Sequence, residues 1–353
     1  MKKKIVVLAG DGIGPEIMES GLRVLSAVEK YCDDEFDYQS FPFGGAGIDE
    51  TGAPLPKETL NACQAADAIL LGAIGGPKWE KAAETPEKGL LALRKSLNLF
   101  ANIRPVAVSD VLAPQSPLKP EIIVGTDLVI VRELSSGIYF GEPRELTPRM
   151  AYDTARYQKN EIEQILHTAF KIAEGRNKRV TSVDKANVLA SSKFWRATAE
   201  EIAKEYPDCQ LDHQYVDSAA MKLIQRPTDF DVIVTDNLFG DILSDEASVL
   251  PGTLGVLPSA SHSIDGPSLY EPIHGSAPDI AGQGIANPIS MILSVAMMLR
   301  QSFAQEQAAQ LIEKACDHVL AQGIATSDLG GTARTKEFTE AVIQICQTSS
   351  ATL

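Results

Sequence analysis

The sequence contains few cysteines and no closely paired ones. Its 353 residues include only five, an odd number, and no two of them form a C-x-x-C pair. Such scattered residues do not outline a disulfide framework, and we expect reduced, mostly buried thiols. The five are Cys32, Cys63, Cys209, Cys316 and Cys346.

Basic tracts and long apolar runs are also scarce. The net charge is −15 and the basic run Lys2–Lys4 is short, so the chain lacks the positive surface that nucleic acids and anionic membranes require. The run Ile5–Ala9 is too short for the core of a signal peptide. The most apolar stretch, Ile289–Leu299, falls well short of the ~20 residues that span a bilayer and predicts a buried helix. We therefore expect a cytoplasmic protein without a nucleic-acid or membrane partner.

A chain of this length exceeds the usual size of one domain, so two domains are expected. Strand-like runs alternate with amphipathic segments, which predicts an α/β protein with largely parallel strands and helices on the faces of the sheets. The first expected pairs are strand 5–9 with helix 15–30, strand 68–74 with helix 88–97, and strand 122–131 with helix 160–174. Further strands are expected near 179–184, 211–216 and 231–235, each followed by a helix.

Segment 135–158 breaks this alternation. It is rich in Gly, Pro, Arg and Tyr and has no helical period, which favours a protruding β arm. The chain can cross between domains at Arg104-Pro105 and at Pro251-Gly252. The first domain is therefore expected to contain both ends of the sequence. Asn287 and Pro288 are expected to begin the apolar helix, as its N-cap and first-turn residue.

Two aspartates four residues apart, Asp241 and Asp245, follow the apolar run Val232–Val234 at the expected start of a helix. Side chains with this spacing lie over one another on a helix, so the two carboxylates converge. A hard divalent cation such as Mg²⁺ or Mn²⁺ would relieve their repulsion, whereas zinc would recruit His or Cys, which are not nearby. The alternative is that acidic residues favour the first turn of any helix because of its dipole.

The glycine-rich segment Leu8–Glu16 invites comparison with a dinucleotide-binding loop. It follows an expected strand and opens an expected helix, but neither Gly10 nor Gly12 begins a G-x-G-x-x-G pattern, because the sixth position is not glycine in either register. A tight strand-to-helix turn explains the segment equally well. Nucleotide binding therefore has to be argued from other residues.

Several segments together resemble the isocitrate/isopropylmalate family of metal-dependent β-decarboxylating dehydrogenases, and the resemblance runs nearly end to end. Besides the Asp241–Asp245 helix, the matching motifs are Gly10–Glu16, Leu71–Pro77, Leu93–Lys95, Phe100–Pro105, Val131–Leu134, Tyr139–Glu142, Asp184–Asn187 and Glu271–Asp279. One departure is Ser135-Ser136, where the family has Thr-Gly before Gly137.

The resemblance implies a two-domain α/β fold that is not a Rossmann fold, with mixed sheets flanked by helices and a protruding β arm. It implies a discontinuous cofactor-side domain made of residues 1–99 and 252–353. Residues 100–251 would then form the domain for substrate, metal and dimerisation, including the arm near 135–158. The implied assembly is a homodimer whose active sites are shared between subunits.

Three arginines are candidates for binding a 2-hydroxy dicarboxylate. Guanidinium groups bind carboxylates in a bidentate manner, and a strongly negative protein must capture such a substrate locally. Arg94, Arg104 and Arg132 each lie in a family motif; any one alone could equally form a surface ion pair. By resemblance, Leu90 and Leu91 form an apolar wall for a branched substituent, which disfavours the third carboxylate of isocitrate. Asn187 is a further implied substrate contact.

The resemblance also implies the catalytic groups. Asp241 and Asp245 would bind the metal together with Asp217 of the neighbouring subunit, which also faces the substrate. Lys185 would take the hydroxyl proton during hydride removal, and Tyr139 would deliver a proton to the carbon left after decarboxylation. A metal would stabilise the enolate that forms when CO₂ leaves. Without the motifs, Lys185 would be read as a surface charge and Tyr139 as a core aromatic residue.

NAD is the implied cofactor. A carboxylate at Asp279 can accept both hydroxyls of the adenosine ribose and would repel the 2′-phosphate of NADP. Backbone N–H groups near Gly275 can approach a pyrophosphate. The complete implied contact set is Ile74, Gly75, Gly76, Pro77, Glu87, Glu271, His274, Gly275, Ser276, Ala277, Pro278, Asp279 and Asn287.

The expected activity is the NAD- and Mg²⁺- or Mn²⁺-dependent oxidative decarboxylation of 3-isopropylmalate to 4-methyl-2-oxopentanoate and CO₂ in leucine biosynthesis. Homoisocitrate, tartrate and malate remain alternative substrates, because a missing alkyl group costs only a few kcal/mol. A Mg²⁺-dependent phosphohydrolase that uses Asp241 and Asp245 is an alternative from another class, although Asp11 inside the glycine run is poorly placed as its nucleophile. A non-catalytic binding protein would leave the metal pair, the arginines, Tyr139 and Lys185 unexplained.

Overall fold

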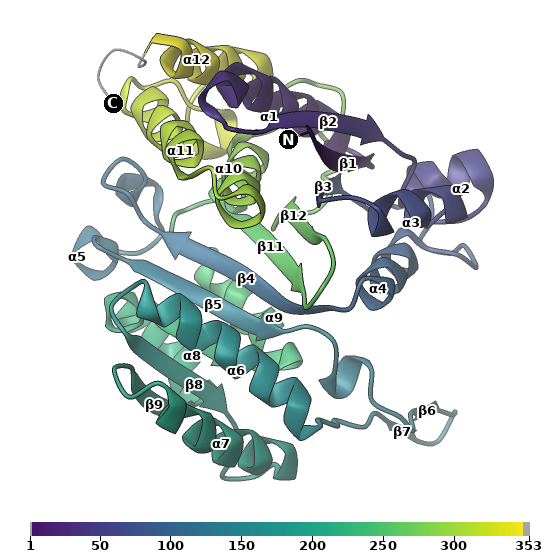
Figure 1. Ribbon diagram of the computed structural model, residues 1–353, viewed down its shortest axis with the longest axis vertical. Coiled ribbons are helices and arrows are strands. Elements are labelled where there is room, and N and C mark those ends of the chain that lie inside the picture. Colours follow the sequence, from purple (N-terminus) through teal and green to yellow (C-terminus); the bar gives the residue numbers. More distant parts are fainter. Residues whose placement is uncertain (1, 349–353) are drawn as a thin grey trace. The chain divides into compact units, whose positions relative to one another are not determined.

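The computed structural model describes residues 2–348. The chain divides into two compact units (Figure 1). Unit 1 contains the chain up to Asn98 and from Thr253 onward, and unit 2 is Leu99–Gly252. The predicted α/β class with mixed sheets flanked by helices is confirmed. The assignment of cofactor to unit 1 and of substrate to unit 2 stays a prediction.

The strands of unit 1 lie in the order β2-β1-β3-β12-β11. β1 pairs in parallel with β2 and β3, β3 pairs in parallel with β12, and β12 pairs antiparallel with β11. All six residues of β3 are buried, which is typical of a parallel strand covered on both faces. The strands are β1 (Lys2–Gly10), β2 (Glu35–Ser40), β3 (Ala68–Ala73), β11 (Pro258–Ser263) and β12 (Ser268–Pro272).

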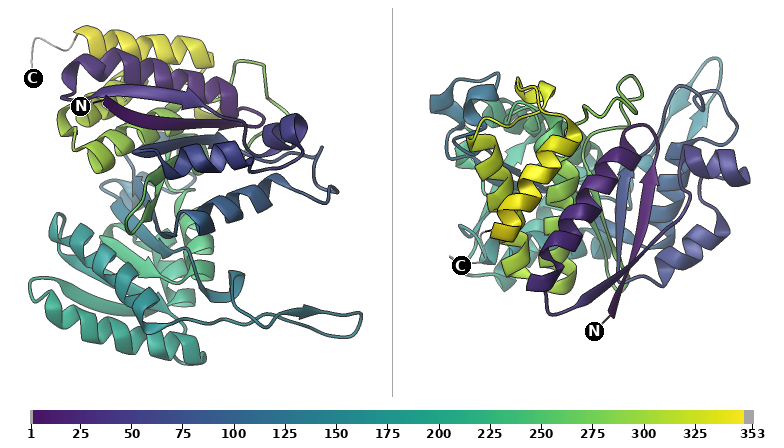
Figure 2. Two further views of the ribbon diagram at one scale, coloured as in Figure 1. Left: turned by 45° about the vertical axis from the view of Figure 1, so that its right-hand side comes forward. Right: turned by 90° about the horizontal axis from the view of Figure 1, so that it is seen from above.

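Four long helices of unit 1, α1, α10, α11 and α12, pack against one another beside these strands (Figure 2). α10 is the central one and is buried along nearly its whole length. Its N-cap is Pro288 rather than the predicted Asn287, but the side-chain Oδ1 of Asn287 still accepts a hydrogen bond from the N–H of Ile289 at 3.0 Å. The helices are α1 (Gly14–Val28), α2 (Gly45–Thr51), α3 (Lys57–Gln64), α4 (Pro86–Ser96), α10 (Ile289–Phe303), α11 (Glu306–Ala321) and α12 (Thr335–Thr348). Within the described residues, no helix is both long and apolar enough to cross a membrane.

The strands of unit 2 lie in the order β4-β5-β10-β8-β9, with β4 antiparallel to β5 and the other neighbours parallel. α6 and α7 cover one face, and α8 and α9 cover the other (Figure 1). The strands are β4 (Leu99–Ala107), β5 (Asp127–Glu133), β8 (Arg179–Asp184), β9 (Gln210–Tyr215) and β10 (Val232–Thr235). The helices are α5 (Pro120–Ile123), α6 (Lys159–Glu174), α7 (Ala190–Ile202), α8 (Val216–Gln225) and α9 (Asn237–Ala247).

The prediction of a strand over 122–131 was wrong in its first part. Pro120–Ile123 form the short helix α5, and β5 begins only at Asp127. Pro120 favours the first turn of a helix, and Gly125 with φ +82° turns the chain before the strand. The two apolar residues Ile122 and Ile123 therefore belong to a helical turn and not to the sheet.

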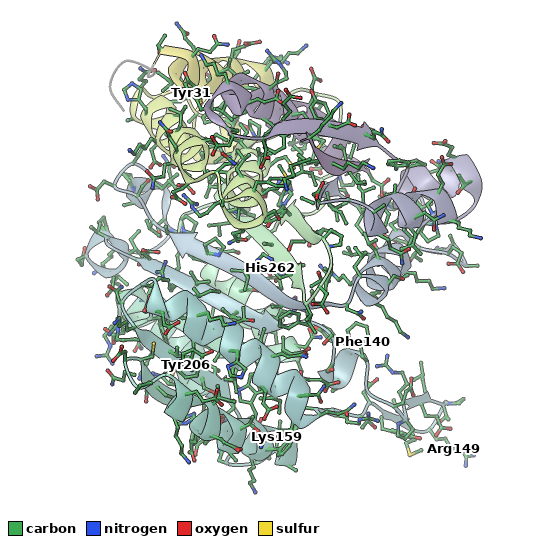
Figure 3. All side chains as sticks on the ribbon, in the orientation of Figure 1. Tyr31, Phe140, Arg149, Lys159, Tyr206 and His262 are labelled. Carbon is green, nitrogen blue, oxygen red and sulfur yellow. The ribbon has the colours of Figure 1, made fainter. Side chains whose placement is uncertain are left out.

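The predicted arm is confirmed. After the 3₁₀ turn η3 (Gly137–Tyr139), the chain runs out as a two-stranded antiparallel ribbon of β6 (Glu145–Leu146) and β7 (Ala151–Tyr152). Arg149 lies at the far end of this ribbon (Figure 3). Leu146 is 86% exposed, so the arm leaves an apolar side chain in solvent.

Glycines allow α1 to begin directly against β3. A Cβ on Gly72 of β3 would lie 2.4 Å from the carbonyl oxygen of Ala9 and 3.1 Å from the Cα of Gly14. A Cβ on Gly14 would lie 2.1 Å from the same oxygen. Close contact between the end of β1, the start of α1 and β3 therefore requires that these positions lack side chains.

We expect Gly72→Ala to lower the free energy of unfolding by about 1–3 kcal/mol, the usual cost of overpacking a close-packed contact. The control is Gly175→Ala at the end of α6, where φ is −84° and the nearest atom to a new Cβ is 3.7 Å away. This control should be neutral or slightly stabilising. Denaturant unfolding of both variants checks the expectation, and equal losses would contradict it.

Candidate active site

Asp236 sets the position of the two metal-candidate aspartates. Its side chain accepts the N–H of Phe239 at 2.8 Å and caps α9, which therefore begins at Asn237. Asp241 and Asp245 lie in the second and third turns, not at the predicted start of the helix. The helix-dipole alternative is therefore wrong for them, since no acidic residue occupies the first turn.

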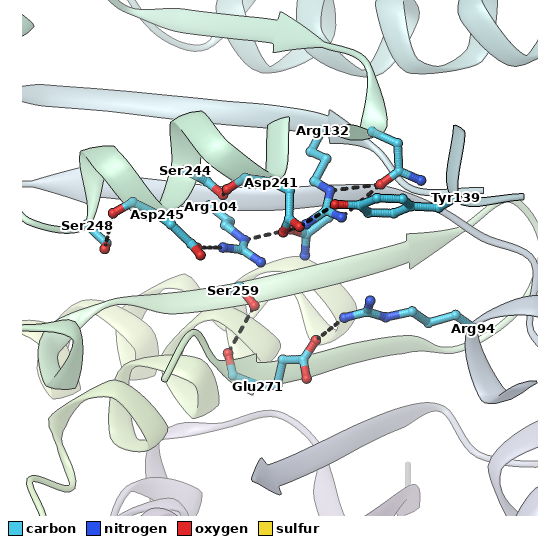
Figure 4. Close-up of polar contacts among 12 residues, drawn as sticks. Arg94, Arg104, Arg132, Tyr139, Asp241, Ser244, Asp245, Ser248, Ser259 and Glu271 are labelled. Carbon is cyan, nitrogen blue, oxygen red and sulfur yellow. Dashed lines mark hydrogen bonds and ion pairs between the residues drawn. The ribbon is translucent and has the colours of Figure 1, made fainter. Parts of the chain in front are cut away.

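The two aspartates lie beside two of the predicted substrate arginines (Figure 4). The guanidinium of Arg132 donates to Asp241, and Nη1 of Arg104 donates to Asp245 at 2.9 Å. The hydroxyl of Tyr139 donates to the other oxygen of Asp241 at 2.7 Å. These five side chains from β4, β5, η3 and α9 form one cluster, which we call the Arg–Asp cluster.

Burial within this cluster is uneven. The side chains of Arg104 and Arg132 are 13% and 5% exposed, whereas those of Asp241 and Asp245 are 37% and 69% exposed. Burial, followed by the bond to Asp241, raises the pKa of Tyr139 to about 12. The phenol therefore keeps its proton throughout the physiological range.

The donor set fits a hard cation. Asp241 and Asp245 offer only carboxylate oxygens, which Mg²⁺ and Mn²⁺ accept. The repulsion between them is already lowered by an arginine on each. No group of three His, Cys, Asp or Glu side chains suited to a metal occurs among residues 2–348. The remaining ligands would then be water, the substrate or a residue from a second chain.

Lys185 and Asp217 form a separate pair in unit 2. Nζ of Lys185 donates to Asp217 at 2.7 Å and lies 5.7 Å from the centre of the Tyr215 ring. The bond from Lys185 lowers the pKa of Asp217, which therefore stays ionised. In the described part of the chain, neither residue has a hydrogen bond or ion pair with the Arg–Asp cluster. Asn187 is exposed in the turn that follows Lys185.

In unit 1, Arg94 of α4 pairs with Glu271 of β12 at 3.1 Å (Figure 4). Both side chains are largely buried, and the Nε of Arg94 is buried without a hydrogen-bond partner. Leu90 lies one turn before Arg94, and its neighbour Leu91 is 44% exposed. Arg94 thus has an unused donor close to the predicted apolar wall.

Asp11 organises the loop predicted for the nicotinamide end of the cofactor, a role that the sequence alone did not reveal. Its buried carboxylate accepts the N–H groups of Gly45 and Ala46 at 2.8 Å and that of Gly75 at 2.9 Å. Gly75 and Gly76 have φ values of +101° and +157°, which only glycine adopts readily. A Cβ on Gly75 would lie 3.0 Å from Oε1 of Glu87. Asp11 therefore fixes the segment from Ile74 to Pro77 beside the start of α4.

The glycine-rich turn serves a packing role. The N–H of Ile13 donates to the carbonyl oxygen of Ser276 at 2.8 Å, and a Cβ on Gly12 would lie 2.0 Å from that oxygen. Glycine is needed at position 12 because another loop approaches it closely. The turn thereby supports the segment Gly275–Asp279 that was predicted to hold the cofactor.

Within that segment, His274 and Ala277 have unusual environments. Nδ1 of His274 is 2.9 Å from the Gly275 carbonyl oxygen, and its Nε2 is buried without a partner. Burial lowers the pKa of His274, which favours the neutral ring. Ala277 has φ +38°, which bends the backbone there, and Asp279 is exposed.

Asn287 is held by a residue that the sequence reasoning missed. Its Nδ2 donates to Asp328 at 2.9 Å, and Asp328 also accepts from the hydroxyls of Thr253 and Thr326 at 2.8 and 2.6 Å. The carboxylate therefore fixes the amide of Asn287. The sequence did not reveal this role, because Asn287 and Thr253 are distant from Asp328 along the chain.

The departure at Ser135-Ser136 is accommodated. Ser136 has φ −135°, so glycine is not required there. Glu133 accepts the N–H and the hydroxyl of Ser135 at 2.7 and 2.6 Å and the N–H of Ser136 at 3.1 Å. The second serine therefore causes no backbone strain, and the first adds a bond to a buried carboxylate.

The comparisons with known proteins define the class as an oxidoreductase of the dehydrogenase type. A model of the isocitrate/isopropylmalate dehydrogenase family matches residues 4–342. The chain belongs to this family.

The similar proteins agree with this assignment. A 3-isopropylmalate dehydrogenase from Streptococcus thermophilus is 65% identical over 97% of this chain and 99% of its own, and one from Listeria innocua is 62% identical over 98% of each. The crystal structure of isocitrate dehydrogenase from Methylococcus capsulatus has a TM-score of 0.86 at 35% identity, covering 98% of this chain and 100% of that chain. A β-decarboxylating dehydrogenase from Thermococcus kodakarensis has a TM-score of 0.84 at 36% identity, covering 99% and 98%.

The environment of Glu133 predicts a pH dependence of stability. Burial raises the pKa of Glu133 from 4.5 to about 7, against the opposing effect of its bonds to Ser135 and Ser136. A group with a raised pKa in the folded state contributes stability below its unfolded pKa, and that contribution is lost as the pH rises through about 7. We expect the melting temperature of the unmodified protein to fall between about pH 5 and about pH 8 by more than that of Glu133→Gln.

Calorimetric melting of both proteins across this range checks the expectation. Burial also raises the pKa of Asp236, to about 6, but this group is present in both proteins, so their difference isolates Glu133. Parallel melting curves would show that Glu133 does not titrate in this window.

Proposed function

We propose that this chain is an NAD- and divalent-metal-dependent enzyme that oxidises and decarboxylates 3-isopropylmalate to 4-methyl-2-oxopentanoate and CO₂ in leucine biosynthesis. The observation that carries the proposal is the Arg–Asp cluster, in which two carboxylates for a hard cation lie beside two guanidinium groups and a protonated phenol. The names of relatives more than 60% identical support the choice of substrate.

Arginines would bind the two carboxylates of the substrate. Arg104 and Arg132 are largely buried and oriented before the substrate arrives, which lowers the entropy cost of binding. The buried, unpartnered Nε of Arg94 offers a further donor. Charge-assisted bonds of this kind are about twice as strong as neutral ones and overcome the repulsion expected from a protein of net charge −15.

Asp241 and Asp245 would hold the metal, with Asp217 of a second subunit as the further ligand. When bound, such an ion acidifies the 2-hydroxyl and stabilises the developing enolate charge. Tyr139 would donate the phenolic proton to the carbon from which CO₂ has left, which its raised pKa permits because the proton is retained until then. Lys185 of the second subunit would accept the hydroxyl proton at Nζ during oxidation.

The cofactor side is inferred from unit 1. The exposed carboxylate of Asp279 suits the two ribose hydroxyls of NAD and repels the additional phosphate of NADP. The orphaned Nε2 of His274 and the fixed amide of Asn287 offer polar contacts for adenine. Asp11 holds the segment from Ile74 to Pro77 for the nicotinamide end, together with Glu87 and Glu271.

We infer a homodimer because, in the described part of one chain, no hydrogen bond or ion pair joins Lys185 or Asp217 to the Arg–Asp cluster. The neighbouring helices α8 and α9 also expose large apolar side chains, with Met221 and Ile242 exposed by 60% and 57%, and Val249 just after α9 is 48% exposed. A second copy of the chain that covers α8 and α9 would bury these side chains. It would also bring its own Lys185 and Asp217 to the Arg–Asp cluster of the first copy. Symmetric pairing of one surface with itself is the commonest arrangement of homodimers.

Two of the alternatives receive less support. The carboxylate of Asp11 is engaged by three backbone N–H groups, so it is not free to act as the nucleophile of a phosphohydrolase. Isocitrate would place its third carboxylate against Leu90 and the half-exposed Leu91, where a charge without a partner is disfavoured.

The first test compares substrates. We expect NADH formation with 3-isopropylmalate and NAD to exceed that with isocitrate, malate or NADP, and to be lost on chelation and restored by Mg²⁺ or Mn²⁺. Preference for isocitrate or malate would overturn the Leu90–Leu91 wall while keeping the chemistry. Activity that survives complete metal removal would contradict the role of Asp241 and Asp245.

A second test addresses the shared active site. Tyr139→Phe and Lys185→Met homodimers should each be nearly inactive. Their random mixing should restore about a quarter of the unmodified activity, because half of the dimers are hybrids and each hybrid has one intact site. Each variant carried alone through the same dissociation and reassociation is the control. Inactive hybrids would place Tyr139 and Lys185 of one site on the same chain.

A further inference from the structure

Three residues of α9 hold the side chain of Arg132. Nε and Nη2 of Arg132 donate to Oδ1 of Asn237 at 3.1 and 2.8 Å, and Nη1 donates to Asp241. Between them lies Gly240, where a Cβ would stand 2.6 Å from Cγ of Arg132. Positions 237, 240 and 241 share one face of a helix, so this face of α9 contacts the Arg132 side chain and binds its guanidinium.

Asn237 is fully buried and connects two parts of the site. Its Nδ2 donates to the carbonyl oxygen of Ser136 at 3.0 Å, and its backbone N–H donates to the hydroxyl of Tyr157 at 3.0 Å. The orientation of the amide is unambiguous, because Arg132 has only donors and the Ser136 carbonyl has only acceptor sites. Ser136 immediately precedes η3, the turn that ends at Tyr139.

We propose that Asn237 is a positioning residue that orients Arg132 for the substrate carboxylate and holds the turn that carries Tyr139. The proposal rests on the function proposed above. Asp241, one turn further along α9, contacts the same two groups through Arg132 and the Tyr139 hydroxyl. Asp241 is also a proposed metal ligand, so substituting it would disturb the metal site as well as Arg132. Asn237 is not a proposed metal ligand, so its substitution tests the positioning of Arg132 and Tyr139.

Only an amide satisfies both neighbours of this buried position. A carboxylate would keep an acceptor for Arg132 but would place an oxygen against the Ser136 carbonyl and add a negative charge that competes with the substrate. A hydroxyl at Asn237→Ser would be too short to reach the guanidinium, leaving a buried charge with fewer partners. Both changes should therefore act on substrate binding and on Tyr139, and not only on folding.

The decisive variant is Asn237→Asp. We expect the KM for 3-isopropylmalate to rise at least about tenfold and kcat to fall, since bonds to charged groups carry this much energy. The KM for NAD should change less than about twofold, because NAD is assigned to other residues. Asn237→Ser should likewise raise the KM for 3-isopropylmalate and lower kcat while leaving the KM for NAD nearly unchanged. It serves as the second variant if the aspartate prevents folding.

Ser248→Ala is the matched control. Ser248 is a buried polar residue at the end of α9, and its hydroxyl donates to the Asp245 carbonyl oxygen at 2.5 Å without contacting Arg132. This variant should leave KM and kcat unchanged, even where it lowers the melting temperature. If the Asn237 variants only lose stability, with the kinetic constants of the unmodified enzyme, then Asn237 is structural and the proposal is wrong.

The activity of the unmodified enzyme distinguishes failure of the positioning proposal from failure of the proposed function. If it prefers another 3-substituted malate, the Asn237 variants should raise the KM for that substrate and not the KM for NAD. Arg132 would bind a carboxylate that all 3-substituted malates share. If it oxidises no 2-hydroxy acid, the proposed function fails and the positioning proposal fails with it. Normal wild-type turnover with kinetically silent Asn237 variants overturns the positioning proposal alone.

Discussion

The burial of the Arg132 guanidinium is the constraint on which the rest of unit 2 depends. A charge that is 5% exposed is tolerated only when its donors are satisfied. α9 provides this through Asn237 and Asp241, and Gly240 lets the helix approach closely enough. The placement of α9 against β5 is therefore fixed by a polar contact as well as by apolar packing. The same contact brings Asp241 and Asp245 to the site.

Charge balance explains how such a site can be stable before any ligand binds. Arg104 and Arg132 are matched by Asp245 and Asp241. A dianionic substrate that arrives with a dication leaves the net charge unchanged. The pairs would exchange partners, and no isolated charge would have to be buried. An acidic protein can in this way bind an anionic substrate.

Helical periodicity and long sequence motifs could be recognised from the sequence, whereas contacts between distant segments could not. The spacing of Asp241 and Asp245 predicted that they share a helix face, because helical periodicity is local. Asp11 was read only as part of a glycine run, since its partners at Gly45 and Gly75 are backbone N–H groups far along the chain. Asp236 was different: an aspartate directly before an apolar-periodic segment is an N-cap signal that would have placed α9 correctly.

Lys185 and Tyr139 have different hydrogen-bond partners within one chain, which gives the proposed dimer a chemical consequence. Within one chain, Lys185 and Asp217 neutralise each other, and Tyr139 donates to Asp241. Each of these four groups is satisfied locally, so none of them needs a second subunit to complete its hydrogen bonds. Met221 and Ile242 nevertheless remain exposed on the helices that follow β9 and β10. Their burial would supply the free energy of association, and association would bring the base to the acid. Assembly would then be the step that completes the catalytic machinery.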